Sequence, residues 1–229
     1  MTQNNISKYI VWTSLCLFTA LFFFEFTQAD VIIQNYFFDP LTQTWLVDKN
    51  NTFLRFIFYS GIKKLLIVFG VGLLITLLFF RKTFFVQTYK KGLLLVVLSA
   101  LAIPLVVGSV KAMTNAPCPC DMKIYNGIYP SVKVFEKYPE DFEEMQPIRC
   151  WPAGHASGGF ALMAFFFFFK TAKNQKRALF FALIIGWSMG GYKMLIGHHF
   201  LSHTIITMLI AWLIILILAK FLKINASLA

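Results

Sequence analysis

Two apolar runs, ALFFALIIGWSMGGYKML at Ala178–Leu195 and TIITMLIAWLIILIL at Thr204–Leu218, are separated by IGHHFLSH at residues 196–203. Runs of this kind approach the length of about 20 residues that a helix needs to cross a bilayer. The segment between them holds three of the four histidines in the chain. Because histidine is the side chain whose ordinary pKa lies nearest neutrality, this connection is a candidate functional site between two membrane helices.

The composition indicates the class of protein. The 229 residues are 58% hydrophobic and 14% charged, with a mean hydropathy of +0.68, whereas a soluble domain usually has about 25% charged residues. We therefore expect an integral membrane protein. The net charge of +11 is spread between the apolar runs without a compact basic patch, so we expect no nucleic-acid partner.

The expected fold is an all-α, polytopic membrane helical bundle with six transmembrane helices, in which residues 1–229 form a single integral membrane domain. The first apolar run is longer than the apolar part of a usual signal peptide, so it is taken as a helix. Residues 30–61 mix turn-forming dipeptides with aromatic side chains and should form an outer interfacial segment. Residues 111–156 should form an outer loop that carries part of the functional site. The six expected spans are Tyr9–Thr27, Ile62–Phe80, Gly92–Val110, Ser157–Phe169, Ala178–Leu195 and Thr204–Leu218.

The distribution of charge predicts the orientation of the bundle. The loops 81–91 and 170–177 each contain four Lys or Arg residues and no acid, whereas all ten acidic residues lie between Glu25 and Glu144. On the positive-inside rule, the basic loops and both termini are cytoplasmic. We therefore expect a multi-pass protein of the cell inner (plasma) membrane, with all four histidines at the periplasmic or outer face.

Two lysines and one turn form a possible phosphate-binding site on this face. Lys111 and Lys193 each lie at the outer end of a predicted helix, where they could hold an anion or simply extend to the membrane interface. The segment PAGHASGG, residues 152–159, resembles a helix start, and the free N–H groups of a first helical turn can bind phosphate. Gly154 and His155 would lie at this positive end. A plain turn that packs helices together is the alternative for this segment.

The histidines at 199 and 203 have the spacing i, i+4, which places them on one face of the helix that opens the last span. One ring can then orient the other. Covalent catalysis on phosphorus requires a neutral nucleophile, a partner that fixes its second nitrogen, and an acid for the leaving oxygen. His199, His203 and His155 fit these roles in that order, and His198 is expected to be a bystander. The alternative is that these histidines have no catalytic role and only make hydrogen bonds at the level of the lipid headgroups.

These residues resemble the signature of the type 2 phosphatidic acid phosphatase and haloperoxidase superfamily, in its membrane lipid phosphatase branch. The family pattern is Lys-x6-Arg-Pro, then Pro-Ser-Gly-His, then Ser-Arg-x5-His-x3-Asp. This chain has Lys111-x6-Cys118-Pro119, then Pro152-Ala153-Gly154-His155, then Tyr192-Lys193-x5-His199-x3-His203. The resemblance covers roughly residues 30–220. It implies a six-helix bundle with an outer site, a phosphohistidine on His199, acid catalysis by His155, and phosphate binding by Lys111 and Lys193.

Four positions differ from the family pattern: Cys118 stands for arginine, Ala153 for serine, Lys193 for arginine and His203 for aspartate. A neutral histidine at position 203 can accept a hydrogen bond, but it carries no negative charge to stabilise a cationic partner ring. Arg149 and Ser157 lie near the second motif in the sequence. They are therefore candidates to replace the contacts that the substituted family residues would make, and Arg149 would bind the phosphate.

Three cysteines, Cys118, Cys120 and Cys150, lie in the predicted outer loop, and Cys16 lies in the first span. A disulfide from Cys150 to either Cys118 or Cys120 would join the two ends of that loop in an oxidising compartment. Three free thiols are one alternative. A metal site built from cysteines and histidines is another, although Cys-x-Cys without a second close pair is a weak zinc signal.

The sequence therefore predicts a metal-independent membrane phosphatase that hydrolyses a lipid phosphate or diphosphate monoester at the outer leaflet through a phosphohistidine. No cofactor is expected. The partner would be a phosphorylated membrane lipid, such as a phospholipid, a polyprenyl diphosphate or a lipid A type molecule. Two alternatives stay open: a phosphotransferase that moves a phosphoryl group between lipids, and a catalytically impaired lipid-binding membrane protein.

Overall fold

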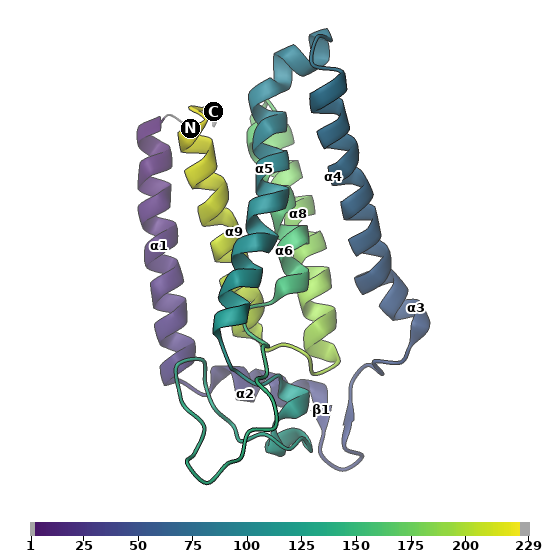
Figure 1. Cartoon of the computed structure of the whole chain (residues 1–229), viewed down its shortest axis with the longest axis vertical. Helices are drawn as coiled ribbons and strands as arrows, with labels where there is room; N and C mark the ends of the chain where they lie inside the picture. Colours follow the sequence, from purple (N-terminus) through teal and green to yellow (C-terminus); the bar gives the residue numbers. More distant parts are fainter. Residues whose placement is uncertain (1–2, 225–229) are drawn as a thin grey trace.

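The computed structural model describes residues 3–224, which fold almost entirely into helices (Figure 1). Within this range, five helices are long and apolar enough to cross a membrane. They are α1 (Gln3–Phe26), the continuous helix of α3 (Thr52–Arg55), η2 (Phe56–Gly61) and α4 (Ile62–Phe79), α5 (Phe84–Met113), α8 (Ala172–Leu195) and α9 (Leu201–Phe221). The prediction of an all-α membrane bundle is confirmed.

The fourth expected span, Ser157–Phe169, is shorter in the structure than the other five. Residues Gly154–Phe168 form it in three pieces, α6 (Gly154–Ala161), η5 (Leu162–Ala164) and α7 (Phe165–Phe168). At about 1.5 Å per helical residue this segment is too short for a hydrocarbon core of about 30 Å. It lies among α5, α8 and α9, and Ala156 and Phe160 are fully buried there. The segment Gly154–Phe168 therefore lies at the centre of the bundle.

The helices begin before their predicted apolar runs. The second helix begins at Thr52, ten residues before the predicted start, so the last ten residues of the predicted interfacial segment, 52–61, are helical. Asn51 explains this start, because its side chain accepts a hydrogen bond from the Leu54 N–H and caps the helix. Thr83 caps α5 in the same way, inside the predicted basic loop 81–91. Likewise α8 begins at Ala172, inside the predicted loop 170–177.

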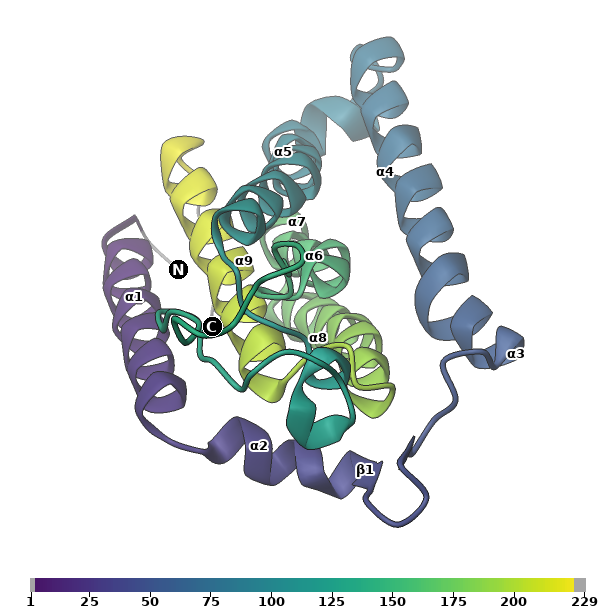
Figure 2. The same ribbon diagram turned by 60° about the horizontal axis from the view of Figure 1, so that its bottom comes forward.

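Glycines bring the central helices into close contact. A Cβ added at Gly159 of α6 would lie 2.7 Å from the Cα of Gly186 in α8, so the two backbones touch there. A Cβ at Gly190 would lie 2.4 Å from Cγ2 of Thr204, which allows α8 and α9 to meet near the histidine segment. In contrast, α4 stands away from the bundle in Figure 2, and its apolar window has no buried residue.

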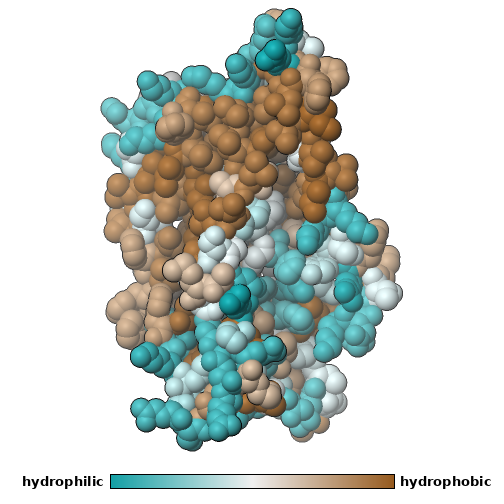
Figure 3. All heavy atoms as spheres, viewed as in Figure 1, coloured by the Kyte–Doolittle hydropathy of each residue, from teal (hydrophilic) through white to brown (hydrophobic). Residues whose placement is uncertain are grey.

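One end of the bundle carries the short helices, a hairpin and the longest loops. It contains α2 (Ala29–Gln34), η1 (Asn35–Phe37), the short hairpin of β1 (Phe38–Asp39) and β2 (Thr44–Trp45), η3 (Pro119–Asp121) and η4 (Lys123–Tyr125). Figure 3 shows hydrophilic side chains gathered at this end, below a hydrophobic belt over the helices. The four histidines lie toward this end, and the start of α1 and the end of α9 lie at the other (Figure 1).

Candidate active site

The end of α8 turns the chain into the histidine segment. Gly197 has a φ of 74°, and its N–H donates to the Met194 carbonyl at 3.0 Å. The His198 N–H donates to the Lys193 carbonyl at 2.8 Å. These two bonds form a Schellman motif, which ends a helix with a left-handed residue. The helix therefore stops directly before His198 and His199.

The outer segment holds this turn from the other side. A Cβ at Gly197 would lie 2.3 Å from the indole of Trp45, so only glycine allows the hairpin to pack there. The Gln34 amide donates to the Met194 carbonyl at 2.9 Å, which gives this carbonyl at the end of α8 a second hydrogen bond. On the far side of the turn, the Ser202 N–H donates to the Asp30 carboxylate at 2.9 Å, at the start of α9. Residues 30–47 therefore fix both ends of the histidine segment.

His199 and His203 form a buried pair. Their Nδ1 atoms are 3.2 Å apart, and each side chain is only 3% exposed. The sequence predicted that both lie on one helix, but α9 begins at Leu201, so His199 lies in the turn before it. The contact survives because the turn folds back over the helix start. Burial, together with the charges of His203, Lys111, His155 and Lys193, lowers the pKa of His199 well below 6.5, so its ring is neutral at pH 7.

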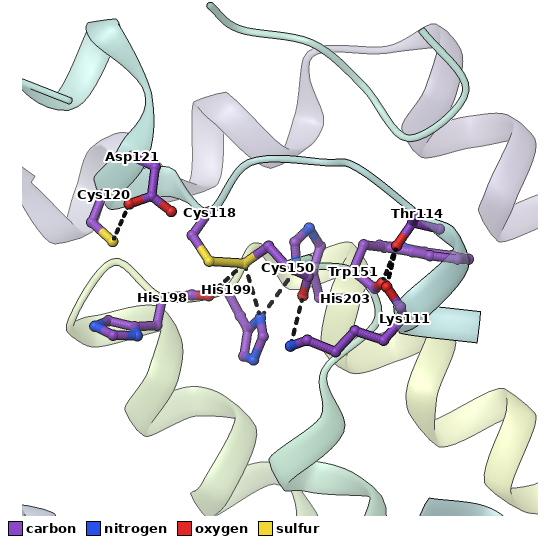
Figure 4. Close-up of a disulfide and its surroundings, with 10 residues drawn as sticks. All are labelled: Lys111, Thr114, Cys118, Cys120, Asp121, Cys150, Trp151, His198, His199 and His203. Carbon is purple, nitrogen blue, oxygen red and sulfur yellow. Dashed lines mark hydrogen bonds between the residues drawn. A yellow bond between two sulfur atoms is a disulfide. The ribbon is translucent and has the colours of Figure 1, made fainter. Parts of the chain in front are cut away.

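The disulfide joins Cys118 to Cys150, and Cys120 is free, which selects one of the two predicted bridges. The Cys150 sulfur lies 3.6 Å from Nδ1 of His199, as Figure 4 shows. A disulfide sulfur has no hydrogen, so in this contact it can only accept, as a weak acceptor, from the His199 ring. The ligand atoms of Cys150, His199 and His203 lie within 4.8 Å of one another, which is close enough for a metal. In the oxidised chain, however, the bridge removes Cys150 from that set of thiolate ligands.

Hydrogen bonds between the two segments that the disulfide joins also position Lys111. The Thr114 hydroxyl donates to the Trp151 carbonyl at 2.6 Å, and the Cys150 N–H donates to the Ala116 carbonyl at 3.1 Å. These bonds tie the end of α5 to the segment that precedes α6. The Lys111 ammonium then lies 3.5 Å from the Cys150 carbonyl, beside the histidine pair in Figure 4. The structure thus brings Lys111 and the pair together, as the spacing predicted.

His155 lies at the start of α6 and meets a residue that the sequence analysis missed. Its Nε2 is 2.9 Å from the Tyr59 hydroxyl, and the two rings are 4.5 Å apart between centroids. The ammonium of Lys193, a side chain that is 9% exposed, lies 4.2 Å from the centre of the same Tyr59 ring. His155 also experiences the charges of Lys193 and Lys111. One tyrosine therefore connects the predicted acid to a predicted phosphate ligand.

A protein-family model described as the PAP2 superfamily matches residues 92–226, more than half of the chain. The chain belongs to the PAP2 superfamily. This confirms the resemblance, and it supports phosphatase-type chemistry on a phosphoric ester. The matched region contains Lys111, Lys193 and all four histidines of the chain, whereas the helix that carries Tyr59 lies outside it. Neither a curated protein nor a solved structure matches the chain.

An apolar cavity leads to this PAP2 site. It has a volume of about 530 Å³ and lies between α4, α5 and α6. Hydrocarbon side chains of all three helices line most of it, among them Leu66, Leu74, Val97, Leu101 and Leu162. Its polar lining consists of Lys63, His155 and Ser157. This cavity is the apolar groove of the site, and it lies next to α4, which stands apart from the bundle in Figure 2.

Two of the residues predicted from sequence lie elsewhere than expected. Arg149 is exposed, and among residues 3–224 no hydrogen bond or ion pair links its side chain to the histidines. The Ser157 hydroxyl donates to the Gly154 carbonyl at 2.6 Å, inside α6, so it serves its own helix. Arg55, which the sequence analysis left in the interfacial segment, interacts electrostatically with Lys193. The sequence held no specific signal for Arg55, because Lys49, Lys123 and other basic residues also lie among the acidic residues.

Proposed function

We propose that this PAP2 protein removes a phosphate from a phosphorylated membrane lipid at the outer leaflet. His199 is the nucleophile, His203 orients it, and His155 protonates the leaving oxygen. Lys111 and Lys193 bind the phosphate, together with the first turn of α6 at Gly154. Arg55 takes the place that the sequence suggested for Arg149.

The apolar groove is the observation that favours a lipid as the substrate. A soluble phosphate ester requires a polar site that opens to water, whereas a lipid phosphate requires an apolar channel with a cationic end. The groove has this character, because leucine and valine side chains line its length and Lys63 and His155 lie in its lining. A lipid whose chain lies between α4 and α5 would present its phosphate to the histidines and lysines.

The reaction divides into two balanced steps. In the first, Nε2 of His199 forms a bond to phosphorus while the bond from phosphorus to the lipid oxygen breaks, and the imidazolium form of His155 gives a proton to that oxygen and becomes neutral. In the second, water attacks the phosphohistidine, His155 takes a proton from the water, and inorganic phosphate leaves. The two lysines offset the negative charge on the phosphoryl oxygens in both steps.

The histidine pair fits a nucleophile with Nε2 as its reactive nitrogen. The Nδ1 of His199 faces Nδ1 of His203, so one of these atoms donates and the other accepts. If His199 donates, its Nε2 carries the free lone pair that a nucleophile needs. His203 is a weaker partner than the aspartate of the family pattern, because it has no charge to stabilise the ring once phosphorus is bound.

Two observations support the outer face as the location of the site. The basic loops lie at the end of the bundle opposite to the histidines, as the positive-inside rule requires for an outer site. The Cys118–Cys150 disulfide lies at the histidine end, and disulfides persist in oxidising compartments such as the periplasm.

Phosphate release from the purified protein in detergent tests this proposal. The substrates are a phosphatidic acid, a polyprenyl diphosphate and a soluble sugar phosphate, each with and without a chelator. We expect release from at least one lipid, none from the sugar phosphate, and no effect of the chelator. His199→Gln should abolish release and acid-labile phosphate on the protein. His198→Gln is the matched control, since its ring is directed away from His203 in Figure 4, and it should stay active.

Other outcomes would point to the alternatives. A doubly phosphorylated lipid formed when a second lipid is added, without inorganic phosphate, would indicate a phosphotransferase. Lipid binding without any turnover would indicate a catalytically impaired protein. Activity that the chelator removes and zinc restores would contradict the phosphohistidine mechanism.

A further inference from the structure

Tyr59 is in contact with two parts of the candidate site at once. Its hydroxyl is 2.9 Å from Nε2 of His155, and its ring face lies 4.2 Å below the ammonium of Lys193. Tyr59 is half-buried and belongs to η2, outside the region that the family model matches. The family pattern therefore assigns it no role.

The backbone around Tyr59 departs from a regular α-helix. Residues Phe56–Gly61 form a π-helical turn between α3 and α4, and such turns are rare and frequent at functional sites. Gly61 permits this turn, because a Cβ there would lie 2.5 Å from the Phe56 carbonyl oxygen. Phe58 stacks on Tyr192 at 5.9 Å between centroids, next to Lys193. The wide turn thus presents two consecutive aromatic residues to the site, one to α8 and one to α6.

We propose that Tyr59 is a positioning residue with two separable roles in the proposed reaction. Its hydroxyl orients His155 for protonation of the leaving oxygen, and its ring holds the ammonium of Lys193 beside the phosphate. This inference rests on the proposed function and adds a residue to its machinery.

The first role follows from how little else anchors the ring of His155. Its Nδ1 is buried, and within residues 3–224 it has no hydrogen-bond partner. The Tyr59 hydroxyl is therefore the polar group that fixes the rotation of the imidazole. A buried N–H without an acceptor is costly, so the favoured tautomer carries its proton on Nε2, toward the hydroxyl. The Tyr59 hydroxyl thus fixes the tautomer of the neutral His155 ring as well as its rotation.

The second role depends on the ring and not on the hydroxyl. A lysine ammonium over an aromatic face is attracted by the negative face of the ring. Lys193 is nearly buried between α8 and η2, and the nearby charges of Arg55 and Lys111 repel it. The ring of Tyr59 offsets part of this repulsion and keeps the ammonium in place before the phosphate arrives. Phenylalanine at position 59 would keep this contact and lose only the hydroxyl.

Two variants and two substrates separate the roles. Tyr59→Phe removes the hydroxyl, and Tyr59→Leu removes the hydroxyl and the ring. The substrates are a long-chain alkyl phosphate, whose alkoxide must be protonated to leave, and a long-chain nitrophenyl phosphate, whose phenolate leaves without a proton. For Tyr59→Phe we expect kcat on the alkyl phosphate to fall at least about 10-fold, within the contribution of an acid catalyst. On the nitrophenyl phosphate kcat should stay within about 2-fold, and KM should be unchanged on both substrates.

For Tyr59→Leu we expect the same loss of kcat and, in addition, a rise of KM by several-fold on both substrates. Tyr129→Phe is the matched control, because it removes the hydroxyl of a buried tyrosine that donates to the Gln146 carbonyl outside the site. It should leave both substrates unaffected. Size-exclusion profiles and thermal unfolding of all variants show that each is folded.

Three results would overturn parts of this inference. An equal loss on both substrates in Tyr59→Phe would mean that the hydroxyl only supports the fold. Unchanged kinetics in both Tyr59 variants, with an active wild type, would remove Tyr59 from the machinery and leave the proposed function intact. A wild type that hydrolyses neither substrate would overturn the proposed function, and this inference with it.

Discussion

Replacing His203 by aspartate tests the partner of the proposed nucleophile. In histidine Nδ1 is bonded to Cγ, and in aspartate Oδ1 is bonded to Cγ, so the new oxygen would lie close to the atom it replaces. The contact of 3.2 Å with Nδ1 of His199 would therefore persist as a hydrogen bond to a charged acceptor. Such bonds contribute about 1.5–3 kcal/mol, against about 0.5–1.5 kcal/mol for neutral ones. The gain of about 1–1.5 kcal/mol predicts a rise in kcat of about 5- to 10-fold.

His203→Ala and His203→Asn complete the series. Alanine removes the partner and leaves Nδ1 of His199 buried without one, at a cost of about 1–3 kcal/mol, so kcat should fall by about 5- to 150-fold. Asparagine keeps a neutral acceptor on Cγ and should stay within about 3-fold of the wild type. The assay is phosphate release at saturating lipid, with thermal unfolding as the control for folding. Aspartate should lower the melting temperature, because it buries a charge.

The pH dependence gives an independent readout. Because burial and neighbouring cations lower the pKa of His199 well below 6.5, kcat/KM of the wild type should stay flat as the pH falls through 6.5. An anion at position 203 favours the protonated ring and raises that pKa, so the acid limb of His203→Asp should move to higher pH. An active alanine variant beside a dead, folded aspartate variant would refute the assignment of His203 as the orienting residue.

Other perturbations have expected outcomes of their own. Cys118→Ser with Cys150→Ser opens a bridge of sequence separation 32 and should lower the free energy of unfolding by about 3–4 kcal/mol, measured in detergent against Cys120→Ser; an unchanged stability would contradict this. An impermeant maleimide should label these two cysteines in intact cells after mild reduction, while Cys120 reacts slowly because burial raises its pKa to about 11; labelling only in broken cells would reverse the orientation. Burial raises the pKa of Asp30 from 3.8 to about 6, so the protein should gain stability as the pH falls from 7 to 4. Asp30→Asn should be more stable by up to about 3 kcal/mol at pH 7 and lose that advantage at pH 4, and equal stability at both pH values would show that the carboxyl is not desolvated.

Features with a period or a spacing could be predicted from the sequence. Apolar runs indicated the helices, and the separation of basic loops from acids matched the two ends of the bundle. The intervals between Lys111, His155, Lys193 and His199 indicated the family, and the structure brings these side chains toward one region. The fold class and most residues of the candidate site could therefore be predicted, because local patterns in a single sequence indicate them.

The remaining features depend on contacts between distant segments. Cys118 and Cys120 lie two residues apart, so spacing could not decide which one reaches Cys150. The prediction that His199 lies in a helix was wrong because the turn at Gly197 is held by Trp45, about 150 residues away in the chain. Tyr59 was missed because a cap at Asn51 extends its helix into a segment whose composition is typical of a loop.

The isolation of α4 makes the surrounding bilayer a part of the protein's architecture. Neighbouring helices bury part of α5, α8 and α9, whereas the apolar window of α4 has no buried residue, so in a bilayer its exposed side chains would pack against acyl chains. The continuous helix Thr52–Phe79, of which α4 is the larger part, has 28 residues. At about 1.5 Å per residue it spans roughly 42 Å, more than a hydrocarbon core of about 30 Å. Membranes of different thickness would therefore change the tilt of α4 to relieve the mismatch, at a modest cost in free energy. The width of the opening between α4 and α5 would change with that tilt. The turnover rate would therefore depend on the thickness of the membrane as well as on the residues of the protein.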